Sequence, residues 1–331
     1  MRILTVTNMF PTERNPQFGI FIQEQVESIR QLGLEVDVLF VNGREGRLRQ
    51  KGYLVGFPAL WRALRSCRYD VIHAHYIFSG IIARAQWAAP LVLTHHGVEV
   101  RDRFQGGLCR LTRFWPDEQI VVADWMIAPL RSPRAHVIPC GIDLDLFRPM
   151  PKADARAQLG LEPEKRYVLF AGYTWDPVKR FHLVEQAVRI LKSRLPDVEL
   201  VAVCQQPHQR IPLYMNACDV FAMTSSFEGS AQVVKEAMAC NLPIVATDAG
   251  DNWDVLGDTA GCYRTGDDPK EIAGHLEAAV SPPLRTDGRK QVERFGLRST
   301  AERVVSVYEA ALRAGPASQR TQSKNLKAEV L

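Results

Sequence analysis

Short apolar runs alternate with amphipathic segments along almost the whole chain. In the first half these runs cover residues 3–6, 36–41, 71–73, 91–94 and 137–138, and in the second half residues 167–171, 199–203, 220–223 and 244–247. Each run has the length and residue types of a buried strand. Strands that alternate with helices over short connections are typical of parallel, doubly wound sheets. The pattern therefore predicts an α/β protein.

Two longer segments show the helical spacing of apolar residues. The first covers residues 19–32, where apolar side chains from Phe21 to Leu32 share one stripe and Gly33 is placed to end the helix. The second covers residues 299–313, where apolar side chains from Ala301 to Leu312 lie on one face. Both segments are predicted to be helices with one apolar face.

Prolines, a glycine and aspartates interrupt the pattern near the middle of the chain. Residues 139–150 have the composition of an ordered linker, with Ile142 and Phe147 as apolar anchors. The tail after residue 314 is rich in Ser, Gln and Lys and lacks aromatic residues, which is typical of disorder. The expected parts are a first domain over 1–138, a linker over 139–150, a second domain over 151–298, a helix over 299–314 and a disordered tail over 315–331.

Composition agrees with two domains and narrows the compartment. A chain of 331 residues is too long for one ordinary α/β core, and its net charge of +4 is too small to indicate nucleic acid. The seven cysteines are scattered without a Cys-x-x-Cys pair, which favours buried thiols in a reducing compartment. No signal-peptide pattern and no apolar run of about 20 residues is found, so we expect a cytoplasmic protein.

Residues 225–240 carry the strongest chemical signal. Glu228 lies in a turn after the run 220–223, and Glu236 lies eight positions later in an apolar, helix-forming stretch. In such a strand–turn–helix unit a ligand binds at the carboxyl end of the strand, and the N–H groups at the start of the helix attract phosphate. Two carboxylates there can accept hydrogen bonds from sugar hydroxyls. Alternatively, Glu236 belongs to the polar face of an amphipathic helix.

Five stretches together resemble the retaining glycosyltransferases of family 4, which have the GT-B architecture. The stretches cover Glu228 to Glu236, the linker 137–149, Thr94-His95-His96-Gly97, Asp70-Val71-Ile72-His73-Ala74-His75 and the N-terminal loop 10–21. The resemblance extends over about residues 1–312. It implies two Rossmann-like domains that face one another across a cleft, with the acceptor on the first, the donor on the second and the last helix crossing back to the first.

The resemblance also implies roles for particular residues. His96, Glu228 and Lys179 would be catalytic, with His96 near the anomeric carbon, Glu228 near the sugar hydroxyls and Lys179 at the diphosphate. The donor-binding set would comprise the backbone of Gly19, Gly229, Ser230 and Ala231, the cation of Arg180, and Glu236 at the ribose hydroxyls. Lys179 read alone could equally be a solvated lysine at a helix start, and His73, His75 and His95 are more often structural.

The same resemblance implies catalysis without a metal or cofactor. Fixed cations and helix dipoles would stabilise the departing diphosphate, and no Asp-x-Asp follows a strand, since Asp143 and Asp145 lie in the linker. The histidines have no neighbours at metal-ligand spacing. One departure from the family is Tyr173, which stands after Gly172 where an arginine is usual.

Basic residues alternate with apolar and aromatic ones in segments 44–68 and 101–115. Both segments lie in the half expected to bind the acceptor. This composition favours peripheral contact with an anionic membrane that carries a lipid-linked acceptor. A solvated helix face gives the same pattern.

We therefore expect a metal-independent glycosyltransferase that moves a sugar from a nucleotide-sugar donor to a polysaccharide, lipid-linked glycan or small-molecule acceptor with retention of configuration. One alternative is a nucleotide-sugar epimerase of the same architecture, and another is an inactive relative that acts as a scaffold, for which Tyr173 is the best support. The sequence does not identify the base, the sugar, the acceptor, the linkage or the oligomeric state.

Overall fold

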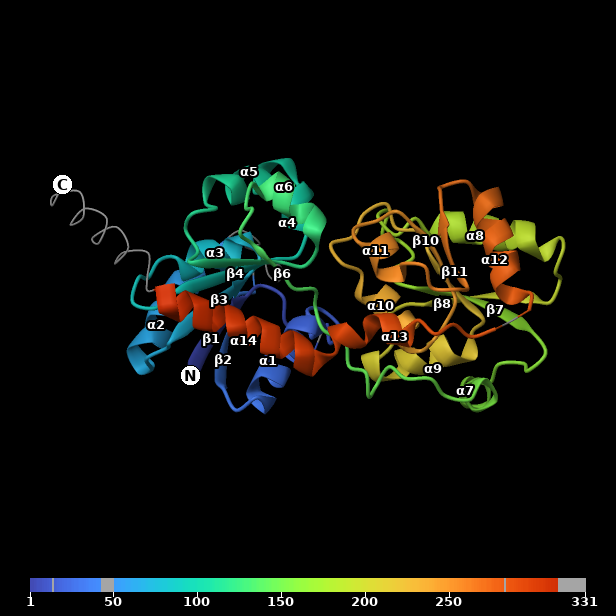
Figure 1. Cartoon of the computed structure of the whole chain (residues 1–331), viewed down its shortest axis with the longest axis horizontal. Helices are drawn as coiled ribbons and strands as arrows, with labels where there is room; N and C mark the ends of the chain where they lie inside the picture. The colour runs from blue at the N-terminus through green and yellow to red at the C-terminus, as the bar shows by residue number, and fades with distance from the viewer. Residues whose placement is uncertain (14, 43–50, 283, 315–331) are drawn as a thin grey trace. The chain divides into compact units, whose positions relative to one another are not determined.

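The structure is a computed structural model that describes residues 1–13, 15–42, 51–282 and 284–314 (Figure 1). The chain forms two compact units. Unit 1 comprises residues 1–141 together with the segment from Leu297 onward, and unit 2 comprises residues 142–296. The expected disordered tail over 315–331 lies outside the described residues.

Unit 1 is built on a six-stranded sheet in the order β2-β1-β3-β4-β5-β6, and every neighbouring pair is parallel. The register aligns Thr7 with His75 and His75 with Thr94, so the carboxyl ends of β1, β3 and β4 meet at one edge. The strands are β1 (Arg2–Thr7), β2 (Glu35–Phe40), β3 (Val71–His75), β4 (Leu91–His95), β5 (Glu118–Val121) and β6 (His136–Val137).

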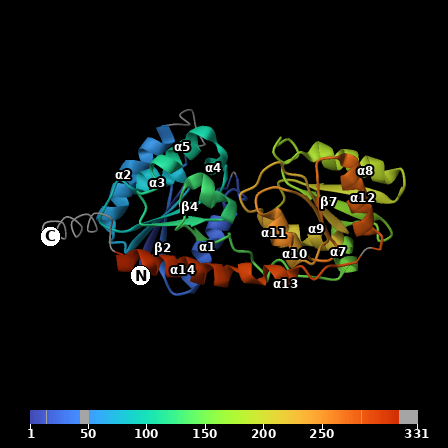
Figure 2. The same cartoon turned by 45° about the horizontal axis from the view of Figure 1, so that its top comes forward.

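Helices cover both faces of this sheet (Figure 2). On one face Ile22, Val26 and Ile29 of α1 join Val304 and Tyr308 of α14 in a single buried cluster. On the other face, side chains of α2, α3, α5 and α6 pack on the strands in a second buried cluster. The helices are α1 (Ile20–Gln31), α2 (Lys51–Ser66), α3 (Ile77–Ala83), α4 (Val98–Arg101), α5 (Arg103–Leu111), η1 (Asp124–Met126), α6 (Ile127–Leu130) and α14 (Leu297–Ala314).

Unit 2 is built on a five-stranded parallel sheet in the order β11-β10-β9-β7-β8. The strands are β7 (Arg166–Ala171), β8 (Val198–Val203), β9 (Val220–Met223), β10 (Ile244–Thr247) and β11 (Cys262–Thr265). One face packs on α8 and α12, and the other packs on α9 and α10. The helices are α7 (Lys152–Leu159), α8 (Phe181–Lys192), η2 (His208–Arg210), α9 (Ile211–Ala217), α10 (Gln232–Ala239), α11 (Asn252–Leu256), α12 (Pro269–Val280), α13 (Arg289–Val292) and η3 (Glu293–Phe295).

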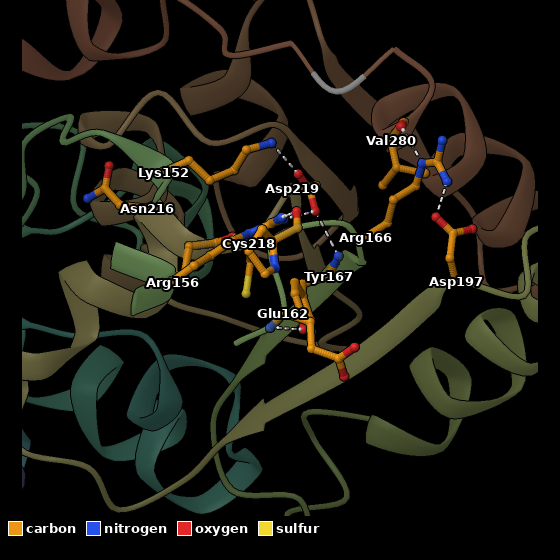
Figure 3. Close-up of polar contacts among 12 residues, drawn as sticks. Lys152, Arg156, Glu162, Arg166, Tyr167, Asp197, Asn216, Cys218, Asp219 and Val280 are labelled. Atoms are coloured by element: carbon orange, nitrogen blue, oxygen red, sulfur yellow. Dashed lines mark hydrogen bonds and ion pairs between the residues drawn. The ribbon is translucent and has the colours of Figure 1, made fainter. Parts of the chain in front are cut away.

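Asp219 anchors the amino-terminal edge of the second sheet (Figure 3). Its buried carboxylate accepts from the Lys152 ammonium at 2.8 Å, the Arg156 guanidinium at 2.9 Å and the backbone N–H of Tyr167 at 2.7 Å. These contacts tie α7 and β7 to the start of β9. A buried carboxylate is tolerated when it is satisfied in this way, and removing one partner leaves a costly unpaired charge. The network fixes the edge that lies opposite the carboxyl ends of the strands.

The expected two doubly wound parallel sheets are confirmed. The sequence pattern missed β5 and β11, because Glu118-Gln119-Ile120-Val121 and Cys262-Tyr263-Arg264-Thr265 are half polar. β11 is an edge strand, and β5 has as its outer neighbour the two-residue strand β6. Strands at such positions need not be apolar on both faces, so no continuous run marks them.

Candidate active site

The loop that carries Glu228 follows the carboxyl end of β9 and leads into α10. A second loop, after β10, touches it through Gly250, whose φ is +66°. A Cβ at Gly250 would lie 2.7 Å from the carbonyl oxygen of Glu228. Only glycine accommodates both this backbone conformation and this approach. The loop around Glu228 is therefore held by its neighbour as well as by its own helix.

Glu228 forms an ion pair with Lys179. The Lys179 Nζ lies 2.6 Å from Glu228 Oε1, and the two side chains are 24% and 16% exposed. Lys179 reaches this point from the loop after β7, 49 positions earlier in the chain. A mostly buried pair is screened less by salt than a surface pair. The structure thus brings together two of the three residues that the sequence analysis expects to be catalytic, and it excludes a fully solvated Lys179.

Arg180 is engaged by the same loop. Its guanidinium donates to the carbonyl oxygens of Thr224 at 2.7 Å and Ser225 at 3.1 Å. It also lies 2.6 Å from a carboxylate oxygen of Asp267. Arg180 therefore holds the end of β9 in place, and the expected contact with the donor stays a prediction.

Glu236 lies on the second turn of α10 and is only 8% exposed. Its Oε1 lies 3.1 Å from Nε2 of His208, whose ring packs 5.1 Å from the ring of Phe147 between centroids. Glu236 therefore does not project into solvent from the polar face of α10, and its expected role at the ribose stays a prediction. His208 was not identified as a site residue, because a histidine after Gln205-Gln206-Pro207 has no motif that points to this contact.

A buried polar network lies behind the start of α10. Ser230 Oγ donates to Asp251 Oδ2 at 2.6 Å, and Lys235 Nζ donates to Ser230 Oγ at 3.2 Å. Lys235 is fully buried, and burial raises the pKa of Asp251 above its ordinary value. Ala231, the N-cap residue, offers no side-chain cap to the first N–H groups of α10. The side chain of Ser230 therefore contacts Asp251. The contact that we expect between Ser230 and the donor involves the backbone N–H of Ser230.

In unit 1, His96 follows the carboxyl end of β4 and touches His75. Its Nε2 lies 3.1 Å from Nδ1 of His75, and its Nδ1 lies 3.9 Å from the sulfur of Cys140. The backbone N–H of His96 donates to Glu99 Oε1 at 2.8 Å. Surrounding side chains desolvate the ring and lower the pKa of His96 to about 3. His96 is therefore neutral near pH 7, and the residue as a whole is half-buried.

The other histidines at this edge are buried. His73 contacts the Tyr308 hydroxyl and the Thr94 hydroxyl, each at 2.7 Å, and burial lowers its pKa to about 3. His95 lies 3.5 Å from Glu99. Both are satisfied by protein groups, as structural histidines should be. His75 is also buried, its pKa is lowered by burial, and its Nε2 has no hydrogen-bond partner.

Gly19 closes the N-terminal loop onto α1. Its φ is +77°, and a Cβ at this position would lie 2.5 Å from the carbonyl carbon of Met9. The residue is therefore required for the loop to reach this close approach. Its expected contact with a phosphate stays a prediction.

Among the described residues, no group of three or more His, Cys, Asp and Glu side chains is arranged to hold a metal ion. Within the same residues, none of the helices is long and apolar enough to cross a membrane.

Comparison with protein families gives two matches. The model described as Glycosyltransferase Family 4 matches residues 19–146, in unit 1. The model described as Glycosyl transferases group 1 matches residues 207–281, in unit 2 and across both Glu228 and Glu236.

Curated relatives include D-inositol 3-phosphate glycosyltransferases. That of Thermobispora bispora is 27% identical over 310 residues, which is 74% of this chain and 71% of the relative. That of Xylanimonas cellulosilytica is 29% identical over 314 residues, which is 75% of this chain and 74% of the relative.

Solved structures share the fold. Sucrose-phosphate synthase of Thermosynechococcus elongatus superposes with a TM-score of 0.78 at 21% identity, covering 95% of this chain and 100% of that one. HepE of Anabaena in complex with UDP superposes with a TM-score of 0.70 at 19% identity, covering 94% and 100%. Together with the two parallel sheets, this likeness establishes the GT-B fold.

Proposed function

We propose that this chain, which belongs to the family 4, group 1 glycosyltransferases, transfers a sugar from a nucleoside-diphosphate donor to a hydroxyl acceptor with retention of configuration. The observation that carries the proposal is the Lys179–Glu228 pair at the carboxyl end of the unit 2 sheet. There a cation and a carboxylate adjoin the start of α10, the position where parallel α/β sheets bind ligands.

The charges suit the departing group. As the bond between the anomeric carbon and the diphosphate oxygen breaks, its electron pair moves to the diphosphate. Lys179 and the N–H groups at the start of α10 would stabilise that charge. The acceptor oxygen bonds to the anomeric carbon from the same face, and its proton goes to the departing diphosphate. This scheme uses no metal and no other cofactor.

The carboxylates suit the hydroxyls of the donor. Glu228 would accept from the transferred sugar, and Glu236, held by His208 at 3.1 Å, would accept from the ribose. In unit 1 the neutral ring of His96 would offer hydrogen bonds to a sugar without adding charge. The network of Ser230, Asp251 and Lys235 would keep the start of α10 in place.

UDP is the nucleotide to test first. HepE, which shares the fold, was solved with UDP and with UDP-glucose. Isothermal titration with UDP, ADP and GDP measures binding, and release of diphosphate from the matching sugar measures turnover. Binding followed by release supports the proposal. Absence of nucleotide binding would favour the scaffold alternative, whereas a changed donor stereochemistry without release would favour the epimerase.

We also propose peripheral contact with an anionic membrane at its cytoplasmic face. Segment 101–115 carries Phe104, Leu111 and Phe114, which are 73%, 75% and 74% exposed. In segment 44–68, residues 44–50 lie outside the described part, and Leu54 and Trp61 of α2 are exposed. Exposed apolar groups beside arginines suit a bilayer interface. Co-sedimentation with anionic vesicles that weakens with salt would support this contact, and binding to neutral vesicles alone would contradict it.

A further inference from the structure

Unit 1 contains a pocket that belongs to neither the candidate active site nor any motif of the family resemblance. It encloses about 390 Å³ and is lined by residues within 113–119, before and at the start of β5, and within 131–135, before β6. The lining therefore lies at the amino ends of parallel strands. His75 and His95 end β3 and β4 at the opposite edge of the same sheet. The pocket is thus separate from the histidine cluster.

The pocket carries an excess of positive charge. Arg113, Arg131 and Arg134 line it together with Asp117 and Glu118. The Asp117 side chain is fully buried, lies 3.7 Å from the guanidinium of the buried Arg84, and accepts from the Leu91 N–H at 2.9 Å. Arg84, which does not line the pocket, thus faces Asp117 Oδ2, whereas the buried Oδ1 has no hydrogen-bond partner among the described residues. Glu118 is in turn hydrogen-bonded at 3.0 Å with His136, also outside.

The arginines are free to meet an anion. Within the part of the chain that the structure describes, the side chains of Arg131 and Arg134 make no ion pair or hydrogen bond. Arg113 is held in position, because its guanidinium lies 4.0 Å over the ring of Phe114 and donates to the carbonyl of Arg110 at 2.8 Å. One fixed and two unengaged guanidinium groups thus surround a concave space. Guanidinium matches phosphate oxygens bidentately.

We propose that this pocket binds the phosphate group of a phosphate ester. Its volume falls in the usual range of small-molecule sites, roughly 300–1,000 Å³, and leaves room for the esterified part beside the phosphate. Phe114, Pro116 and Pro133 supply apolar surface for that part. The ester has two sources with the same chemistry: a soluble sugar or polyol phosphate, or the headgroup of a phospholipid. The proposal goes beyond the transferase activity and does not depend on it.

The test measures amide hydrogen exchange with two probes, glycerol 3-phosphate and vesicles of phosphatidylglycerol in phosphatidylcholine. Binding at the pocket slows exchange in peptides 113–119 and 131–135, whereas binding at the donor site would slow it in peptides around 225–232. The variant combines Arg131→Asn with Arg134→Ala. Asparagine is chosen because Arg131 has φ +55°, and asparagine tolerates this conformation. The matched control combines Arg189→Ala with Lys270→Ala, two exposed residues of unit 2 that remove the same charge.

If glycerol 3-phosphate slows exchange at the pocket, its affinity should fall about tenfold or more in the variant and stay unchanged in the control. This result identifies a soluble ester as the ligand. The same pattern with anionic vesicles alone identifies the lipid headgroup. Both results support the proposal. It is overturned if neither probe slows exchange at the pocket, or if the variant and the control weaken binding equally. Thermal unfolding confirms that both variants fold, and neither result bears on donor turnover.

Discussion

The two sheets present polar side chains at their carboxyl edges in opposite electrostatic states. In unit 1 these are imidazoles that burial keeps neutral, with the pKa of His73 and of His96 at about 3. In unit 2 they are the Lys179–Glu228, His208–Glu236 and Arg180–Asp267 contacts. The same architecture thus presents neutral imidazoles beside the buried Glu99 on one unit and ion pairs on the other. This division suits the proposed transfer of a sugar from a diphosphate donor to an uncharged hydroxyl.

Low pH should have the largest effect, and it should destabilise unit 1 before unit 2. The folded-state pKa of His73 and His96 lies below the ordinary value of 6.5, so the unfolded chain takes up protons first as the pH falls. Stability is therefore greatest above pH 6.5 and is lost toward pH 3, at about 1.4 kcal/mol per pH unit for each such histidine. Hydrogen exchange between pH 7 and pH 4 should show β3 and β4 losing protection before β7 and β9.

A pair of substitutions checks the cause of this acid sensitivity. His75→Gln should make the stability of unit 1 less steep in pH, because it removes one buried imidazole. His182→Gln, at an exposed position of unit 2, should leave the slope as it is. Earlier loss of protection in unit 2 would contradict the prediction.

Removing the ammonium group of Lys179 should have the next largest effect. We expect Lys179→Ala to lower turnover by about 100- to 1,000-fold, or about 2.7–4 kcal/mol, because the departing diphosphate loses a fixed positive charge. Lys179→Arg should recover part of the rate, and Lys192→Ala, which disrupts an exposed pair with Glu199, should leave it unchanged. Single-turnover measurements test this prediction. An Arg variant as slow as the Ala variant would count against a purely electrostatic role.

Glu236→Ala should act on binding rather than on turnover. The substitution removes the carboxylate that would accept from ribose hydroxyls and leaves His208 without that partner. We expect nucleotide affinity to fall about tenfold or more, equivalent to about 1.4 kcal/mol or more, with turnover at saturating donor little changed. Titration of His208→Asn with the same nucleotide separates the two side chains. Unchanged affinity in Glu236→Ala would refute the assignment.

Tyr308→Phe should affect stability alone, and the effect should be confined to unit 1. It removes the hydroxyl that lies 2.7 Å from His73 Nδ1 and leaves that buried nitrogen unpaired. The free energy of unfolding in urea should fall by about 1–3 kcal/mol. Ser306→Ala, on the exposed side of α14, should change it by less than about 0.5 kcal/mol. A Tyr308→Phe variant as stable as the parent chain would show that the contact does not contribute.

The sequence predicted the two sheets because most of their strands are continuous apolar runs. A strand that is covered on both faces needs apolar residues at successive positions, so such a run marks it. It singled out Glu228 and Glu236 from one local motif, and Lys179 through the family resemblance. It could not predict that Lys179 meets Glu228, because the two are joined only through the folded sheet. Their expected roles, with those of His96, Gly19, Arg180, Gly229, Ser230 and Ala231, remain predictions.

Some residues of the candidate site gave no usable signal. Asp251 and His208 lie in loops where polar residues are ordinary, and their contacts arise only once β9, β10 and η2 come together. Lys235 did carry a signal, since it stands between Val234 and Glu236 in an otherwise apolar stretch. A lysine is seldom fully buried without a partner, and the structure supplies Ser230.

The packing of α14 on the first sheet has a consequence for biosynthesis. Side chains of α14, among them Val304 and Tyr308, complete a core whose remaining members lie between Ile3 and Ile138, so this face stays uncovered until the ribosome has made α14, after all of unit 2. Unit 2 is one uninterrupted segment, so it can complete its hydrophobic core earlier. We therefore expect the nascent polypeptide to depend on chaperones for its amino-terminal half, although that half emerges first.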